Sequence, residues 1–510
     1  MPNTARQVVS AADVLDEAKP DCGRCISTGR KCDGYSSLAF SRRELVQATA
    51  SRPCGQDLRR TASPSSYGIL PRLICDPAFS DVREKRYFQF FRRRTVESTN
   101  SLVGFTFWSR LVLQIAHAEP AIKHAALTLG ALHQYLDLPD EDPTRADHLA
   151  FTEEQHRKAL TAAKILVASA TPEDLDRVLA ACVLFICYEG IRGDYAASRV
   201  HMESGRSIVK TNRERLRQSS RRNDLVEIQY ALARLDLSAL TFQDTSAPMT
   251  LCVDEYYQMH PSTTPDITFD TFAEAHASLT DLARLVMIAD TPSSDSITGA
   301  SNWNMDVYNT ERAKCAILVR RWKTKFEDLL CCHPDAAPPL SINMLRMMHA
   351  TTSIIIAAGE FGPDTRWDEH YDGFVEIVDL AELIVAELCQ SGCQSYFSVE
   401  QGYIDGAFLV ATRCRNPVVR RRAIEVLRRL PRQEGIWQSA GAAAVALRWM
   451  EVEEEGPQAP ECASDVRTRV SSARTSANVD ASSVRLQLYM STREPAHPVV
   501  REEYVQWQKK

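Results

Sequence analysis

The chain has 510 residues, of which 44% are hydrophobic and 25% are charged, and these values are typical of a globular protein. A chain of this length can bury a large core, so we expect several domains or one large helical domain with tails. The formal net charge of −6 excludes a protein that coats nucleic acid along its whole surface. Any DNA contact must therefore come from a local patch.

The first residues indicate the cellular compartment, because they do not resemble a secretory signal peptide. MPNTARQVVSAADVLDEAKP has no apolar core of the kind found in secretory signal peptides. The longest apolar runs, such as LAACVLFICY at residues 179–188, are too short to cross a bilayer. We therefore expect an intracellular, soluble protein with no membrane partner. Its 15 cysteines are then expected to be reduced and mostly buried as small apolar residues.

Residues 1–35 carry three cysteines at a spacing typical of metal ligands. They are Cys22, Cys25 and Cys32, within KPDCGRCISTGRKCDGY at residues 19–35. Two residues between the first pair let both sulfurs face one ion, and the following loop lets the third return to it. Neighbouring lysines and arginines favour the thiolate form and suit phosphate contacts. The pattern predicts that these three cysteines bind zinc, although a structural zinc site needs four ligands.

The next segments differ sharply in pattern. Residues 36–77 mix Ser, Arg, Pro and Gly without periodicity, which is typical of a linker. Over residues 78–456, apolar side chains recur at spacings of three and four, which predicts helices. Between residues 111 and 136 this pattern fits one helix, or two helices joined near Pro120.

Helix boundaries are clearest at TPEDLDRVLAACVLFICYEG, residues 171–190. Thr171 suits an N-cap and Pro172 the first turn, while Gly190 and Gly193 suit the end. The helix between them is apolar nearly all round, so we expect it to be buried. Further helices are predicted at residues 275–289, 311–330, 340–358, 372–390 and 418–432.

The predicted fold class is all-α, with one large helical domain over residues 78–456. Strand alternation and fixed-period repeats are not recognisable in this region. Residues 457–510 are predicted to be a loosely ordered tail that contains one short extended segment, VRLQLYM at residues 484–490.

Several clusters of polar residues raise alternative functions. His117, His124 and His133 share one helical run and would suit a metal site or an acid–base pair, but we expect hydrogen-bonded packing residues. Cys389 and Cys393 are expected at the core or its rim. The sequence has no nucleotide-binding glycine loop, nucleophile elbow or metalloprotease helix motif. We therefore predict that the protein is not an enzyme and has no catalytic residues.

Two charged runs can each be interpreted in two ways, as a binding surface or as a solvated part of a helix. Arg421, Arg422, Arg428 and Arg429 lie mostly off the apolar stripe of their helix, so they form either a nucleic-acid patch or a solvated face. We expect the solvated face. The acidic run MEVEEEG at residues 450–456 is expected to be a solvated helix end, with an acidic face for the transcriptional machinery as the alternative.

KPDCGRCISTGRKCDGY resembles the second half of the fungal binuclear zinc-cluster DNA-binding domain, in which six cysteines hold two zinc ions. Cys22, Cys25 and Cys32 match the fourth, fifth and sixth ligands, and Pro20 matches the loop proline. The upstream stretch ARQVVSAADVL contains no cysteine, and Leu15 stands where the third ligand is expected. The resemblance implies zinc as the cofactor of the intact domain, but its first half and the base-reading helix are absent from this chain.

Long stretches between residues 80 and 460 resemble the fungal-specific regulatory domain that follows such clusters. They include YFQFFRRRTVESTNSLVGFTFWSRLVLQIAHAEPAIKHAALTLGALHQYL and ATRCRNPVVRRRAIEVLRRLPRQEGIW. The resemblance implies a nuclear transcription regulator whose helical domain controls its activity through a small-molecule or protein signal. DNA is the implied partner, and a homodimer is left open.

The missing half of the cluster leaves two further explanations. The chain is either a regulatory or interaction protein that has lost DNA binding, or its first exon is misassigned. We favour a misassigned exon because Asp16 to Tyr35 keep the family pattern closely. Sequencing of the 5′ end of the transcript would then reveal an upstream exon rich in Cys, Lys and Arg. For the chain as given, we predict fewer than two bound zinc ions and no sequence-specific DNA shift.

Overall fold

The computed structural model describes residues 79, 81–99, 105–139, 141–219, 221–242, 268–290, 305–359, 364–390, 397–398, 401–455, 469–478, 482–490 and 499–507. The chain divides into two compact units, residues 1–74 and 75–510. All described residues belong to the second unit, so the fold below is the fold of that unit alone.

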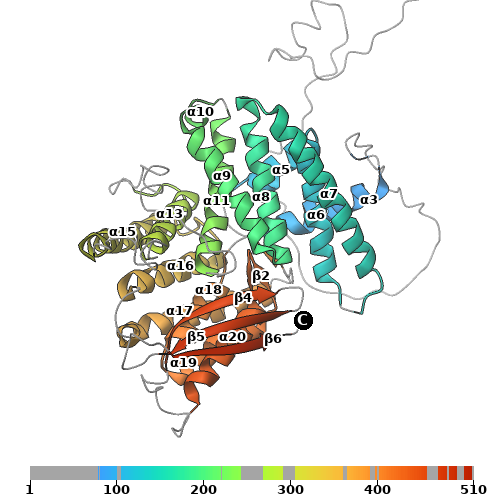
Figure 1. The fold of residues 1–510 in the computed structure, drawn as a ribbon. Coiled ribbons are helices and arrows are strands. Elements are labelled where there is room, and N and C mark those ends of the chain that lie inside the picture. Colours follow the sequence, from blue (N-terminus) through green and yellow to red (C-terminus); the bar gives the residue numbers. More distant parts are fainter. Residues whose placement is uncertain are drawn as a thin grey trace, which may run out of the picture. The chain divides into compact units, whose positions relative to one another are not determined.

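The second unit is built mainly from α-helices, which confirms the predicted all-α class (Figure 1). Its first helices are α3 (Val82–Phe90), α4 (Val96–Thr99), α5 (Val112–Ala116), α6 (Pro120–Asp137), α7 (Arg145–Ser169), α8 (Leu175–Arg192), α9 (Tyr195–Thr211), α10 (Arg213–Gln218) and α11 (Arg222–Phe242), with the short turns η1 (Phe91–Thr95), η2 (Phe107–Leu111) and η3 (Pro172–Asp174). The later helices are α13 (Phe272–Asp290), α15 (Met305–Cys332), α16 (Pro339–Ala358), α17 (Tyr371–Gln390), α18 (Ile404–Arg413), α19 (Pro417–Arg429) and α20 (Ser439–Glu454), with the turn η4 (Asp364–His370).

The predicted helix boundaries near Pro120 and Thr171 are confirmed. The chain forms two helices, α5 and α6, because Pro120 starts a new helix whose cap is the Glu119 side chain. Thr171 forms a capping box at η3, and α8 follows directly. Gly193 ends α8 with φ = 81°, a left-handed conformation that favours glycine. Gly190 lies inside α8, so only the second of the two predicted glycines terminates the helix.

Two large apolar clusters organise the helices. The first surrounds α8, whose side chains are buried nearly all round as predicted, and includes residues of α3, α6, α7, α9 and α11. The second joins α16 to α20 around residues with no exposed surface, such as Ile377 and Ala407. Smaller clusters join α13 and α15 to α16. Each cluster therefore forms an apolar core between the helices that it joins.

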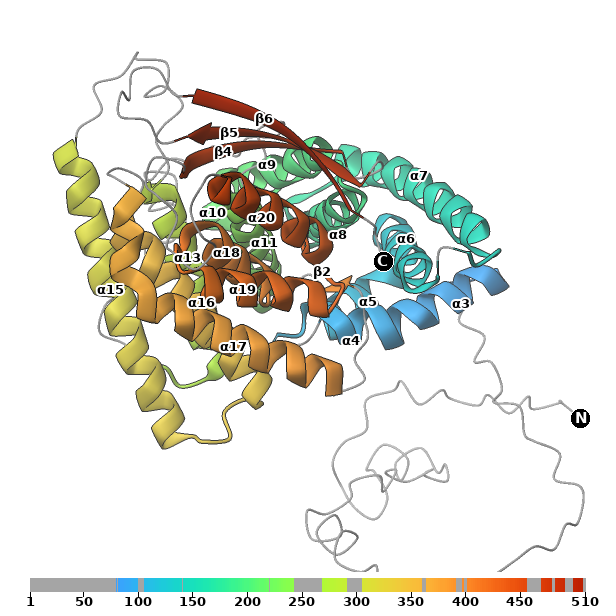
Figure 2. The same ribbon diagram turned by 90° about the horizontal axis from the view of Figure 1, so that it is seen from below.

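The C-terminal segment corrects the prediction of a loosely ordered tail over residues 457–510. It contains three antiparallel strands in the order β4 (Val470–Asn478), β5 (Ser483–Met490) and β6 (Val499–Gln506). Val484, Leu486 and Leu488 alternate inward from β5 and pack against Trp449 of α20, which explains why these strands form. The sheet lies over α20 (Figure 2). A second, minimal sheet is formed by β1 (Phe397–Ser398), β2 (Gln433–Glu434) and β3 (Trp437–Gln438).

Among the described residues, no helix combines the length and the apolar character needed to cross a membrane.

Candidate functional site

The predicted zinc ligands Cys22, Cys25 and Cys32 lie outside the described residues. Within the described ranges, no group of three or more His, Cys, Asp or Glu side chains is arranged to hold a metal ion. The zinc site therefore stays a prediction from the sequence.

Two of the three histidines of the α5–α6 region, His124 and His133, are hydrogen-bonded packing residues as expected, whereas His117 is exposed. Their partners differ: the Nδ1 of His133 lies 2.9 Å from the Thr95 hydroxyl, and the Nδ1 of His124 lies 2.7 Å from Gln155 Oε1. Burial lowers the pKa of His124. The ring of His117 meets the edges of two phenylalanine rings. These separate surroundings give no common acid–base pair.

The arginines of α19 confirm the prediction of a solvated face, since Arg421, Arg428 and Arg429 are exposed and Arg422 is half-buried. Arg420 is buried and donates to Glu453 at 2.7 Å, and Arg421 donates to Glu454 at 2.6 Å. Arg422 donates to Glu382 of α17 at 2.9 and 3.0 Å. Carboxylates of neighbouring helices thus neutralise these three side chains. Arg428 and Arg429 are exposed at the end of α19.

The acidic run at residues 450–456 supplies two of these three partners, and its exposed Glu451 and Glu455 fit the predicted solvated helix end, whereas Glu453 does not. Glu453 is buried and accepts hydrogen bonds from Trp449 Nε1 at 3.1 Å and from the backbone N–H of Val470 at 2.9 Å, in addition to the bond from Arg420. This single carboxylate therefore joins α19, α20 and β4. Glu455 pairs with Arg501 of β6.

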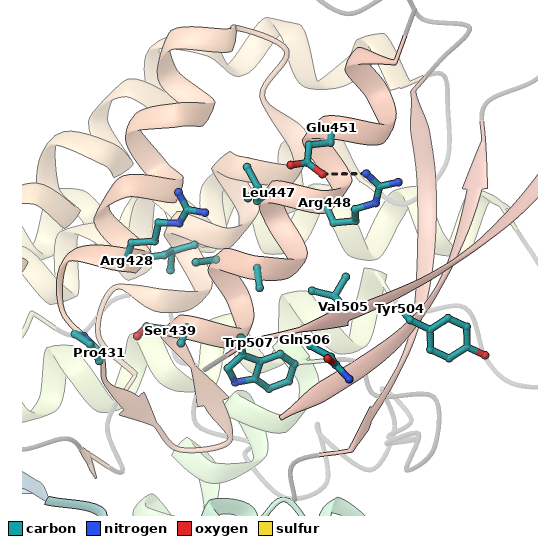
Figure 3. Close-up of a pocket in the computed structure, with 14 residues that line it drawn as sticks. Arg428, Pro431, Ser439, Leu447, Arg448, Glu451, Tyr504, Val505, Gln506 and Trp507 are labelled. Carbon is teal, nitrogen blue, oxygen red and sulfur yellow. Dashed lines mark hydrogen bonds and ion pairs between the residues drawn. The ribbon is translucent and has the colours of Figure 1, made fainter. Parts of the chain in front are cut away.

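A groove of about 690 Å³ lies between the end of α19, one face of α20 and β6 (Figure 3). Its apolar lining is shared by the two helices: Leu427, Ala440, Ala443, Ala444 and Leu447. The β6 side contributes Tyr504, Val505 and Trp507. Figure 3 shows the ion pair between Glu451 and Arg448 toward one end of the groove and Trp507 toward the other.

Among its described lining residues, the groove combines apolar surface with one exposed cation. Arg448 is held at 2.9 Å from Glu451 and at 3.0 Å from Glu503, so its charge is balanced locally. Arg428 lines the same groove and is exposed. The arrangement suits an apolar or aromatic ligand with an acidic group. Sequence reasoning missed this site because β6 falls in the segment predicted to be a loose tail.

A buried acidic cluster lies at the start of α18. Glu434 accepts hydrogen bonds from the backbone N–H groups of Gly402, Tyr403 and Ile404 at 2.9, 3.0 and 3.2 Å, and so caps this helix from a distant part of the chain. Burial, followed by the nearby Glu434 charge, raises the pKa of Asp405 to about 7. Asp405 itself is half-buried, and its raised pKa predicts that the stability of this region changes with pH.

Comparisons with known proteins agree on one kind of protein. Residues 86–304 match the fungal specific transcription factor domain. The aspercryptin biosynthesis cluster-specific transcription regulator atnN of Emericella nidulans is 24% identical over 542 residues, which cover 86% of this chain and 85% of that protein. The transcription regulator lscL of Purpureocillium lilacinum is 24% identical over 377 residues, which cover 67% of this chain and 83% of that protein. No solved structure gives a significant match. Together these comparisons show that the chain is similar to fungal transcription regulators over most of its length.

Proposed function

We propose that the chain is a nuclear transcription regulator of the binuclear zinc-cluster type. In its intact form the N-terminal domain binds two zinc ions and reads a DNA sequence, and the helical unit controls its activity. The observation that carries the proposal is the presence of Cys22, Cys25 and Cys32, with zinc-cluster spacing, on the same chain as a transcription factor domain match at residues 86–304. A domain this small depends on its metal to fold.

The targets are proposed from the relatives. One of them is named as the regulator of a biosynthesis gene cluster. We infer a similar role for this chain, the control of a set of biosynthetic genes. Deletion of the gene should change the transcripts of a defined gene set, as measured by RNA sequencing with the restored gene as control. An unchanged transcriptome under conditions in which the protein is made would contradict the proposal.

A second candidate is a regulator that acts without binding DNA itself. It is favoured by the stretch ARQVVSAADVL, which carries none of the first three cysteines of the cluster. Such a protein would pair with an intact relative or respond to a ligand. It would change transcripts as well, so the deletion experiment does not separate the two candidates.

Zinc content and DNA binding separate them. For the purified 510-residue chain we expect fewer than two zinc ions by mass spectrometry and no sequence-specific gel shift, because three ligands are missing. The variant Cys22→Ser/Cys25→Ser should lose any zinc that is bound, whereas Cys389→Ser, an exposed cysteine on α17, should not. Two tightly bound zinc ions, or a specific shift that survives moderate salt, would refute this expectation and favour direct DNA reading by this chain.

A further inference from the structure

We propose that a pocket between α9, α10 and α11 binds a small apolar molecule with a carboxylate group. The pocket has a volume of about 190 Å³ and is distinct from the groove beside β6. It is formed where α9 passes into α10 at Asn212 and the chain turns back into α11. This site does not depend on the function proposed above, because the charge and the shape of the pocket define it.

Four cationic side chains line this pocket: Lys210, Arg213, Arg217 and Arg222. None of its described lining residues carries a carboxylate. The surrounding stretch is strongly basic, since residues 199–222 contain eight lysines and arginines and two glutamates in a chain whose net charge is −6. Cations gathered in a concave site raise the local concentration of anions. The lining therefore selects for negative charge.

The hydrogen bonds of two of these side chains also indicate a site for an anion. The Nε atom of Arg213 is buried and has no hydrogen-bond acceptor among the described residues. Such an orphaned donor costs free energy unless a ligand or water accepts from it. Arg217 makes a long contact of 3.4 Å with Glu214, and the two side chains are 49% and 73% exposed, so this pair is weak. An anion in the pocket would satisfy both guanidinium groups.

The walls of the pocket restrict the ligand to an amphiphile. Val209, Leu216 and Val226 supply apolar surface, and Leu216 is buried while Val226 is 54% exposed. Apolar surface of this kind gains from covering an alkyl or aryl group but not from a phosphate ion. The volume corresponds to about six water molecules at about 30 Å³ each, so a short acid of about ten non-hydrogen atoms fits. Duplex DNA would instead use exposed cations outside the pocket, such as Arg215, equally well.

The test uses octanoate as the probe and isothermal titration of the full chain at pH 7. We expect one octanoate per chain, bound about tenfold or more tightly than 1-octanol, and no binding of octylammonium, because these molecules match in size but differ in charge. Arg213→Gln should weaken octanoate binding about tenfold. Arg215→Gln, the same change on the same helix outside the pocket, should leave it within about twofold.

A second variant controls for the possibility that the first one loses binding because it unfolds. Arg222 is exposed, so Arg222→Gln should keep the melting temperature of the parent chain and still weaken octanoate binding. Equal binding of octanoate and 1-octanol would overturn the proposal by showing an apolar pocket without charge selection. An equal loss in Arg213→Gln and Arg215→Gln, together with binding of duplex DNA, would overturn it in favour of a diffuse nucleic-acid surface. Absence of octanoate binding in the parent chain would also refute it.

Discussion

The ion pair between Arg420 and Glu453 gives the sharpest test of how the C-terminal part of the fold is held together. Both residues are almost fully buried, at 1% and 2% relative exposure, and their atoms lie 2.7 Å apart. Glu453→Gln removes the counter-charge and leaves a buried guanidinium unpaired. We expect the free energy of unfolding to fall by about 3–5 kcal/mol, the usual cost of removing one partner of a buried pair.

The neighbouring pair supplies a matched control. Arg421 and Glu454 are adjacent to the buried residues on the same two helices and lie 2.6 Å apart, but their side chains are 42% and 25% exposed. Water and salt screen such a pair, so Arg421→Gln should cost less than about 1 kcal/mol. Arg420→Gln and Arg421→Gln therefore share the residue type, the helix and the change of charge, and differ in burial.

The assay is urea unfolding followed by tryptophan fluorescence, with Glu453→Gln, Arg420→Gln and the double variant. Trp449 donates to Glu453, so its emission reports on the same site. The double variant should be more stable than the sum of the single losses predicts, by about 1–3 kcal/mol, because its two mutations remove one shared interaction. Additive losses, or equal costs for Arg420→Gln and Arg421→Gln, would refute the assignment of this pair as a buried structural element.

Two further predictions concern other parts of the helical unit. The pKa of Asp405 is raised from 3.8 to about 7 in the folded chain, so its contribution to stability is complete below pH 3.8 and is lost as the pH rises to about 7. In urea unfolding at a series of pH values, Asp405→Asn should therefore gain stability relative to the parent chain across this window, and parallel curves would contradict the shift. A Cβ at Gly130 would lie 2.7 Å from the Tyr87 carbonyl oxygen and 3.0 Å from Phe91 Cβ, so Gly130→Ala should lower the free energy of unfolding by about 1–3 kcal/mol. Gly205→Ala, whose Cβ would approach Leu232 at 3.3 Å, should cost clearly less in the same thermal or urea assay, and equal costs would show that backbone crowding at Gly130 is not the cause.

Features set by neighbouring residues in the chain were predictable from the sequence. The capping box at Thr171, the helix start at Pro120 and the burial of α8 all follow from local spacing and composition. The roles of Arg420 and Arg421 were not predictable, because both adjacent arginines pair with glutamates of α20 and differ only in how deeply they are buried. Burial therefore depends on α20, which is distant in the sequence from the start of α19.

The missed sheet has a similar cause. β5 shows alternation in VRLQLYM, but β4 reads VSSARTSAN, which is too polar for a recognisable strand pattern. Its order comes from pairing with β5 and from the contact of Val470 with the helices. The groove beside β6 depends on this sheet, so it could not be predicted either. The predicted zinc ligands, by contrast, rest on spacing alone and lie outside the described residues.

The position of Glu453 also has a consequence for biosynthesis. Glu453 accepts one hydrogen bond from the backbone N–H of Val470. The strands that follow in the sequence cover the apolar side chains of α20 near Glu453, including Trp449. A growing polypeptide that has emerged from the ribosome only as far as α20 therefore exposes this face and lacks that bond. The helices of the last cluster can pack together at that stage, but they acquire their final cover only after residues 470–506 are translated. Chains that stall or terminate in between present an uncovered apolar surface to chaperones and proteases.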